Sequence, residues 1–241
     1  GDVYKRQAWD LAPGIYGADF AEDYELTERI GFGGSLTGGN EDYGSHSLSA
    51  NIFYLDTSVL SESAFTNRGR TKKSDSGVSN TETLESFSIT LDGGDMPFAP
   101  GLSYSLGLER QEHGNDDPED ELGFVAGLYG AFDVSDETTL EPILEYAYLD
   151  NAEGQRQDRQ YITVGAGIFQ GPWNLSASYT GRFTDPKGED NIDDTLFQVS
   201  LGYEFDFGLG VDFGYRFTEE EEIDSHTLGV LFAYEFDALI Y

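Results

Sequence analysis

The chain has 241 residues, a formal net charge of −33 and no cysteine. With 46 acidic against 13 basic residues it lacks the basic surface that phosphate binding needs, so nucleic acid is excluded as a partner. Disulfides and thiolate metal sites are excluded as well, and no apolar run approaches the roughly 18–20 residues that a membrane helix needs. The 15 Tyr, 17 Phe and 30 Gly fit an all-β protein, either soluble or a transmembrane barrel whose alternate residues face lipid.

The N-terminal third of the chain carries weak strand patterns. Residues 1–7, "GDVYKRQ", have no apolar core and no cleavage-site pattern, so we expect a non-native start and a missing export signal. Residues 8–18 are predicted as a first strand, interrupted by Pro13. Alternation of apolar and polar residues then predicts strands over residues 24–37, 46–56, 84–92 and 101–110.

The alternation is stronger in the rest of the chain. It predicts strands over residues 120–134, 138–150, 160–169, 173–183, both halves of 196–217, and 228–236. Within 196–217 every odd position is apolar and almost every even position is polar or glycine, which indicates side chains leaving opposite faces of a strand. Because the parity continues through the turn, we predict an odd number of turn residues, with Gly208 or Gly210 at positive φ.

The predicted connectors alternate in length. The long ones are 57–82, 111–120, 151–159, 184–193 and 218–226, the shorter ones are 38–44, 135–137, 170–172 and the turn near Gly208, and 93–100 is intermediate. Long loops on one rim and short turns on the other are typical of a transmembrane up-and-down antiparallel β-barrel. Such barrels have an even number of strands, so we predict one domain over residues 1–241 with twelve strands, counting 8–18, or alternatively ten.

The polar strand faces are rich in Gly, Ser and Thr, which favours a curved wall around a confined interior with the apolar faces turned to lipid. Aromatic residues of the apolar parity fall near both predicted rims, as interfacial girdles would. Examples are Trp173 and Tyr203 near the short-turn rim, and Tyr179 and Tyr215 near the other. A transmembrane barrel is therefore favoured over a soluble one.

With these features, residues 20–241 resemble a bacterial outer-membrane β-barrel of the small porin-like class. The last segment, "TLGVLFAYEFDALIY", is similar to the terminal assembly signal of such proteins and ends in the aromatic Tyr241, although its alternating series runs through Ile240. The resemblance implies a location in the bacterial outer membrane, surrounded by its lipid. It also implies the barrel-assembly machinery as a partner of the C-terminal strand.

Catalysis is not expected from this sequence, because none of its three histidines is paired with a nucleophile at a workable spacing. Acidic loops offer oxygen ligands for Ca²⁺ or Mg²⁺, but none has the ligand spacing of an EF-hand loop. We therefore expect no cofactor and no specific metal site, only loose cation contacts at the loops. The candidate contacts are Asp116, Asp117, Glu119, Asp120, Glu189, Asp190, Asp193 and Asp194.

Charged residues on the polar parity of the strands are predicted to line the lumen. They are Arg29, Glu109, Glu141, Glu145, Arg182, Glu204, Asp212, Arg216 and Glu235. Because acidic linings favour cations, we predict a channel for small hydrophilic solutes or ions with a cation bias. The opposing hypothesis is that these charges pair off, Arg182 and Arg216 with Glu204 or other carboxylates, and plug the barrel.

Three further functions stay open. They are a non-conducting structural or adhesion barrel that displays acidic extracellular loops, a soluble acidic β-barrel binding module, and an autotransporter translocator if a passenger precedes residue 1. The longest loop, 57–82, carries four basic residues, Arg68, Arg70, Lys72 and Lys73. It is expected either to stay mobile outside the barrel or to fold inward as a constriction.

Overall fold

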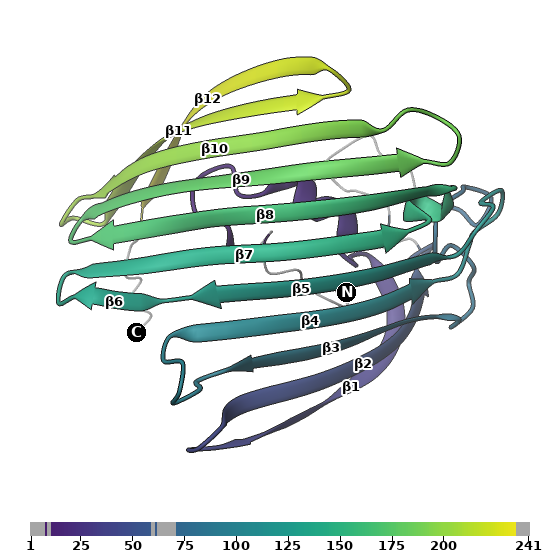
Figure 1. Cartoon of the computed structure of the whole chain (residues 1–241), viewed down its shortest axis with the longest axis horizontal. Helices are drawn as coiled ribbons and strands as arrows, with labels where there is room; N and C mark the ends of the chain where they lie inside the picture. Colours follow the sequence, from purple (N-terminus) through teal and green to yellow (C-terminus); the bar gives the residue numbers. More distant parts are fainter. Residues whose placement is uncertain (1–7, 9–10, 59–60, 62–70, 235–241) are drawn as a thin grey trace, which may run out of the picture.

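Twelve antiparallel strands form one continuous curved sheet in the computed structural model (Figure 1), which describes residues 8, 11–58, 61 and 71–234. Eleven of them are neighbours in chain order, and β6 pairs with β7 beside the end of β5. The strands are β1 (Arg29–Asn40), β2 (Gly44–Leu55), β3 (Ser86–Gly94), β4 (Leu102–Gln111), β5 (Glu121–Gly130), β6 (Phe132–Ser135), β7 (Thr138–Asp150), β8 (Gln157–Gln170), β9 (Trp173–Pro186), β10 (Ile192–Glu204), β11 (Leu209–Glu220) and β12 (Ile223–Tyr234). The described residues also form the short 3₁₀ helices η1 (Asp19–Tyr24) and η3 (Ala152–Gly154).

The strand count of twelve is confirmed, but the twelfth strand is not where the sequence placed it. The predicted strand 120–134 is interrupted at Ala131 and forms both β5 and β6, each paired with β7. The strand predicted over residues 8–18 is wrong, since residues 11–18 lie in no strand. Gly14 and Gly17 take positive φ there, and Pro13 has no N–H to donate, so this stretch cannot hold an extended ladder.

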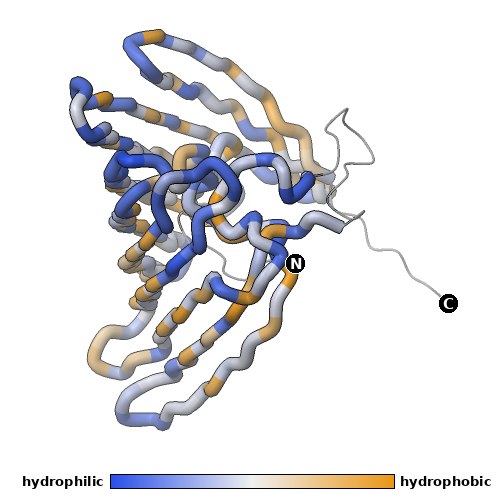
Figure 2. Tube along the Cα trace, turned by 90° about the vertical axis from the view of Figure 1, so that its right-hand side faces the viewer, coloured by the Kyte–Doolittle hydropathy of each residue, from blue (hydrophilic) through white to orange (hydrophobic). Residues whose placement is uncertain are grey.

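The sheet is polar inside and apolar outside, as the alternation predicted. Along β8, Thr163 is fully buried, whereas its neighbours Ile162 and Val164 are each 41% exposed. Along β10, Gln198 is fully buried, and the flanking Phe197 is exposed. Figure 2 shows this alternation of hydropathy along the curved strands. A water-soluble barrel would bury the apolar set instead, so the outer surface is suited to lipid.

The connectors follow the predicted sorting in part, because connector 95–101 on the short-turn rim is longer than 151–156 and 187–191 on the other. Four of the five connectors on one rim are loops, 56–85, 112–120, 151–156 and 187–191. The predicted long loop 218–226 is instead a two-residue turn at Glu221 and Glu222, whose φ values of 50° and 65° match a type I′ hairpin. The acidic residues on either side of this turn belong to β11 and β12. These strands stay paired beyond their apolar stretches, because polar side chains do not prevent hydrogen bonding between backbones. On the opposite rim, Gly208 has the predicted positive φ, and residues 205–209 separate the paired Glu204 and Gly210.

Residues 11–24, here called the luminal segment, lie against the concave face of the sheet. In Figure 1 this segment is the purple coil behind β7–β10. Its apolar side chains pack with inward-facing residues of the sheet and form the main buried cluster. The members of this cluster are Ala8, Ala12, Ala18, Phe20, Ala21, Tyr24, Val125, Tyr129, Ile143, Ala147, Leu149, Ala152, Tyr161 and Leu196.

The two edges of the sheet are β1 and β12. Within the described residues no ladder joins these strands, so closure of the barrel is not observed there. Both edge strands are exposed along most of their length. Among the described residues, no helix has the length and apolar character needed to cross a membrane.

Candidate functional site

The first feature of the interior is an ion cluster around Arg182, which β9 directs toward the luminal segment. The Arg182 guanidinium donates to Asp23 of η1 and to Asp194 of β10, each at 2.9 Å, and to Glu220 of β11 at 3.1 Å. The same guanidinium lies 4.3 Å from the ring centroid of Phe20. Because a buried carboxylate such as Asp194 needs a partner, this cluster fixes η1 against three adjacent strands.

Arg216 of β11 makes a second anchor. Its guanidinium donates to Asp19 and lies 5.1 Å from the ring centroid of Tyr16. Close by, the Ile15 backbone N–H donates to Ser200 Oγ at 3.1 Å. The luminal segment thus supplies a carboxylate to each of the two arginines in this part of the interior.

Glu145 of β7 is the third anchor. Its carboxylate, 1% exposed, accepts hydrogen bonds from the Tyr24 hydroxyl at 2.6 Å and from the Ala8 backbone N–H at 3.2 Å. The Tyr24 ring packs edge-on against Tyr161 at 4.8 Å, and the Tyr161 hydroxyl donates to Asp23 at 2.9 Å. Glu145 therefore holds the luminal segment and does not line open water.

Glycines on the polar parity make room for the luminal segment. A Cβ placed on Gly214 of β11 would come within 2.6 Å of Ile15 Cγ1, and one on Gly229 of β12 would collide with the Tyr16 hydroxyl. Glycine at these positions allows the backbones to approach closely. The glycines of the polar strand faces, from which a curved wall was predicted, therefore also leave the space that the luminal segment occupies.

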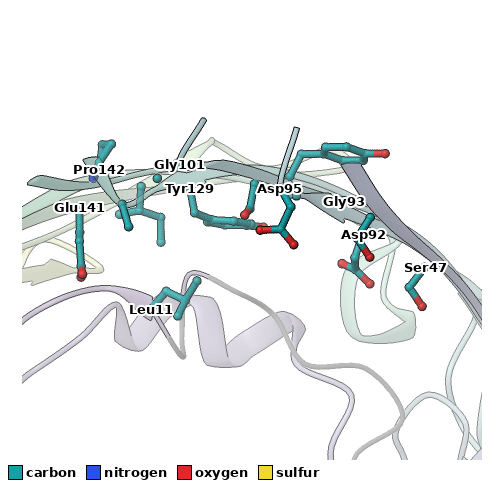
Figure 3. A pocket seen from close by; sticks show the side chains of 16 residues that line it. Leu11, Ser47, Asp92, Gly93, Asp95, Gly101, Tyr129, Glu141 and Pro142 are labelled. Carbon is teal, nitrogen blue, oxygen red and sulfur yellow. The ribbon is translucent and has the colours of Figure 1, made fainter. Parts of the chain in front are cut away.

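A pocket of about 540 Å³ lies beside the luminal segment, between Leu11 and the inner faces of β2–β5 and β7. Figure 3 shows its carboxylates, Asp92, Asp95 and Glu141, around this space. Its lining contains serines, glycines and Tyr129, and no basic residue is found among the described residues that line it. The charge of this part of the interior is therefore negative and solvated, unlike the paired charges near Arg182.

The predicted luminal residues fall into distinct surroundings. Arg182, Arg216 and Glu145 contact the luminal segment, and Glu141 lines the acidic pocket. The expected network around the two arginines draws its carboxylates from η1, Asp194 and Glu220. Among the described contacts, Glu204 is not part of it, because this residue lies exposed at the short-turn end of β10.

The other predicted luminal residues are bound to the wall or undescribed. Asp212 accepts a hydrogen bond from Asn174 at 3.1 Å, and Glu109 is 3% exposed beneath Gly123. Arg29 donates at 2.9 Å to Gln111, near the long-loop rim. Glu235 lies outside the described residues.

Sequence reasoning missed Asp19 and Asp23, which pair with the arginines, and Asp92 and Asp95, which line the pocket. Asp19 and Asp23 lie in a segment without period-two alternation, and their arginine partners are more than 150 positions away in the sequence. One signal was available: an arginine inside a barrel needs a carboxylate, and "DFAED" offers two of them four residues apart, the spacing of one helical face. Asp92 and Asp95 were taken as the end of a strand and a connector.

The predicted loop cation contacts are partly occupied by protein donors. Asp117 accepts the Gly77 N–H at 2.8 Å, and Glu119 binds Arg156 at 3.2 Å. Asp193 and Asp194 belong to β10, not to a loop, and Asp194 is bound by Arg182. Of the four other candidates, Asp120 is bound by Arg110 and His113, and Asp116, Glu189 and Asp190 are exposed.

Glu112, His113 and Asp120 bring ligand atoms within 4.8 Å of one another. Arg110 donates at 2.8 Å to Glu112 and at 2.6 Å to Asp120, so its positive charge already occupies the cluster. The hydrogen bond to Asp120 raises the pKa of His113, and Glu112 and Asp117 add to this electrostatically. The pKa of Asp120 is lowered: burial opposes this, but the bonds from His113 and Arg110 outweigh it.

The described part of the longest loop is fastened to the rim. The Ser79 N–H donates to the Glu112 carbonyl at 2.7 Å, and Asn80 Nδ2 donates to the Lys72 carbonyl at 2.8 Å. Lys73 pairs with Glu82 at 3.4 Å. Residues 71–85 are therefore held at the rim of the sheet. The other two basic residues of the loop, Arg68 and Arg70, lie outside the described residues.

The comparisons with known proteins place the fold. No family model matches the sequence, and no curated protein does. Among solved structures the chain is similar to the crystal structure of the outer membrane channel DcaP of Acinetobacter baumannii, with a TM-score of 0.57 and 13% identity. The match covers 93% of this chain and 67% of that one. The chain therefore has the all-β, antiparallel fold of an outer-membrane channel.

Proposed function

We propose that the protein is a channel of the bacterial outer membrane that passes small hydrophilic solutes or ions and prefers cations. The observation that carries this proposal is the inverted sheet, with an apolar outside and a polar inside that contains a solvent-sized acidic pocket. A packed soluble domain has no use for such an interior. The fold shared with an outer-membrane channel supports the same function.

The cation preference follows from how the interior charges are paired. Arg182 and Arg216 are matched by carboxylates, so their positive charge is cancelled locally. Asp92, Asp95 and Glu141 face a pocket that no basic residue lines within the described part of the chain. A solute entering beside the luminal segment therefore meets a negative potential, which attracts cations and repels anions.

Outer-membrane lipid is the surroundings we propose for the apolar face. Trp173, Tyr203, Phe205 and Phe207 form a row of ring contacts near the short-turn rim, with centroids 4.6–5.4 Å apart. Aromatic rows of this kind anchor barrels at the lipid–water interface. Recognition by the barrel-assembly machinery stays a prediction, since residues 235–241 lie outside the described residues.

The test is single-channel recording of refolded protein in a planar bilayer under a KCl gradient. We expect discrete conductance steps and a reversal potential on the cation side of zero. The variant Asp92→Asn/Asp95→Asn/Glu141→Gln should move the reversal potential toward zero, whereas Glu189→Gln/Asp190→Asn, on an exposed loop, should not. Conduction that is equally cation-selective in all three proteins would contradict the role of the pocket.

A non-conducting barrel is the second candidate, and the luminal segment favours it by filling part of the interior. Its acidic rim would then be the working surface. Electrical silence from protein shown to be folded and inserted would establish this candidate and overturn the channel.

A further inference from the structure

The luminal segment is attached to the wall differently from the way the strands are attached to each other. Strands share backbone ladders, such as the twelve-residue register of β11 and β12. The bonds named above between the luminal segment and the wall each use at least one side chain, as do two more, from Gln198 Nε2 to the Pro13 carbonyl and from Ser178 Oγ to the Gly17 carbonyl. A segment held in this way can leave without breaking the sheet.

Departure of the segment would change the charge of the interior as well as its width. Arg216 would lose Asp19, the carboxylate that it contacts, and Arg182 would lose Asp23 while keeping Asp194 and Glu220. The two aspartates move with the segment, and both arginines stay with the wall. The vacated space would therefore be more positive than the interior is with the segment bound.

We propose that the luminal segment is a releasable gate whose Asp19 and Asp23 also set charge selectivity. Bound, the segment confines solutes to the acidic pocket and cancels the two arginines. Released, it opens a wider passage in which Arg216 attracts anions, so the cation preference falls. This inference rests on the proposed channel function, and its experiments separate the two.

Two double variants weaken the same anchors with opposite effects on charge. Asp19→Asn/Asp23→Asn leaves both arginines in place, and Arg182→Gln/Arg216→Gln removes them. In planar bilayers we expect both to add a larger conductance level absent from the wild type. Relative to the wild type, the reversal potential of that level should move toward the chloride equilibrium potential in Asp19→Asn/Asp23→Asn. It should move toward the potassium equilibrium potential in Arg182→Gln/Arg216→Gln. Shifts in the same direction, or no new level in either variant, would overturn the proposal.

A covalent tether between the luminal segment and the wall tests whether the larger conductance level requires release of the segment. Because the chain has no cysteine, Ile15→Cys/Gly214→Cys can form one disulfide, at positions where a Gly214 Cβ lies 2.6 Å from Ile15 Cγ1. We place this pair in the Asp19→Asn/Asp23→Asn background. The larger level should be missing when the pair is oxidised and return after dithiothreitol. Its persistence in protein shown to be fully oxidised would contradict the gate.

A readout independent of conduction separates this inference from the channel proposal. A single Ile15→Cys should react slowly with a membrane-impermeant maleimide in proteoliposomes, and much faster when Asp19→Asn/Asp23→Asn is added. Faster labelling without any conductance in any variant would refute the channel and keep the releasable segment. Equal labelling rates with wild-type conduction would refute the gate and keep the channel.

Discussion

Two regions of the inner wall handle charge in opposite ways. On β9–β11, Arg182 and Arg216 are partly buried against the luminal segment, with side chains 16% and 28% exposed, and are paired with carboxylates. The other region has Asp92 on β3, Asp95 in the turn after β3 and Glu141 on β7, which face a pocket where the described residues include no opposing basic side chain. The difference follows from water: a buried charge must find a partner, whereas a solvated one keeps its charge unpaired at little cost. The packed region therefore contributes stability, and the solvated region contributes an unpaired negative charge to the interior.

Among the variants that test this difference between the two regions, Arg182→Ala should have the largest effect on stability. It leaves Asp194, which is 3% exposed, together with Asp23 and Glu220, without the guanidinium, so the free energy of unfolding should fall by about 3 kcal/mol. Urea unfolding in detergent or lipid measures this change. The control is Arg156→Ala, a 67% exposed side chain whose single pair with Glu119 should contribute less than about 1 kcal/mol. Equal losses in both variants would mean that the packed region is not held by its ion cluster.

A second variant probes the anchor at Glu145. Tyr24→Phe removes the 2.6 Å hydrogen bond to this buried carboxylate, and the free energy of unfolding should fall by about 1–2 kcal/mol. Tyr146→Phe is the matched control, because its hydroxyl reaches Gln160 at 3.3 Å in an exposed position. The same unfolding assay applies, and a Tyr24→Phe protein as stable as its control would show that this hydrogen bond does not fasten the segment.

A third variant adds a positive charge to the solvated region, so that one of its carboxylates becomes paired as those of the packed region are. Ser47 lines the pocket and lies opposite Asp92 in the β2–β3 register, so Ser47→Lys places a positive charge beside that carboxylate. An opposite unit charge a few ångströms away in water is worth about 1 kcal/mol, which corresponds to a several-fold loss of cation preference. Ser47→Gln adds similar bulk without charge and should change conductance more than reversal potential. If both variants shift the reversal potential alike, the pocket acts through its size.

The smallest effect is expected outside both regions, at His113 in the loop between β4 and β5. Because Asp120 raises the pKa of His113, its contribution to stability is complete below its ordinary value of 6.5 and is lost as the pH rises through the raised pKa. The residue is half-exposed and charge pairs of that kind are weak, so the loss should stay below about 1 kcal/mol. Thermal midpoints measured across this pH range should fall slightly in the wild type and stay flatter in His113→Gln. A large fall that survives the substitution would place the titrating group elsewhere.

The outer wall could be predicted from the sequence because its rules are local. Alternation at period two sets which side chains face out, and each of the eleven alternating segments contains a strand of the described sheet, although residues 24–28 precede β1 and Leu26 among them is buried. The boundary errors occurred where the pattern is interrupted without loss of pairing, as at Ala131 and at Glu221 and Glu222. The odd number of residues in the turn at Gly208 could be predicted, because the apolar positions keep the same parity on both sides of the turn.

The interior was harder to predict, because its contacts join residues far apart in the sequence. Predicting a strand over residues 8–18 required a ladder across Pro13 and two glycines at positive φ, and the structure instead places this stretch beneath side chains of β9–β11. Glu145 and Arg182 were assigned to the lumen from parity alone. Parity cannot tell a side chain in open water from one covered by another segment.

The sequence distance between Asp19 and Arg216 also has a consequence for the order of assembly. Their contact spans 197 positions, so the N-terminal segment is made long before the strand that holds it. Contacts of such long range form late, after the sheet has paid the cost of closing the intervening chain. Refolding should therefore pass through a species with its β-sheet formed and its interior still empty.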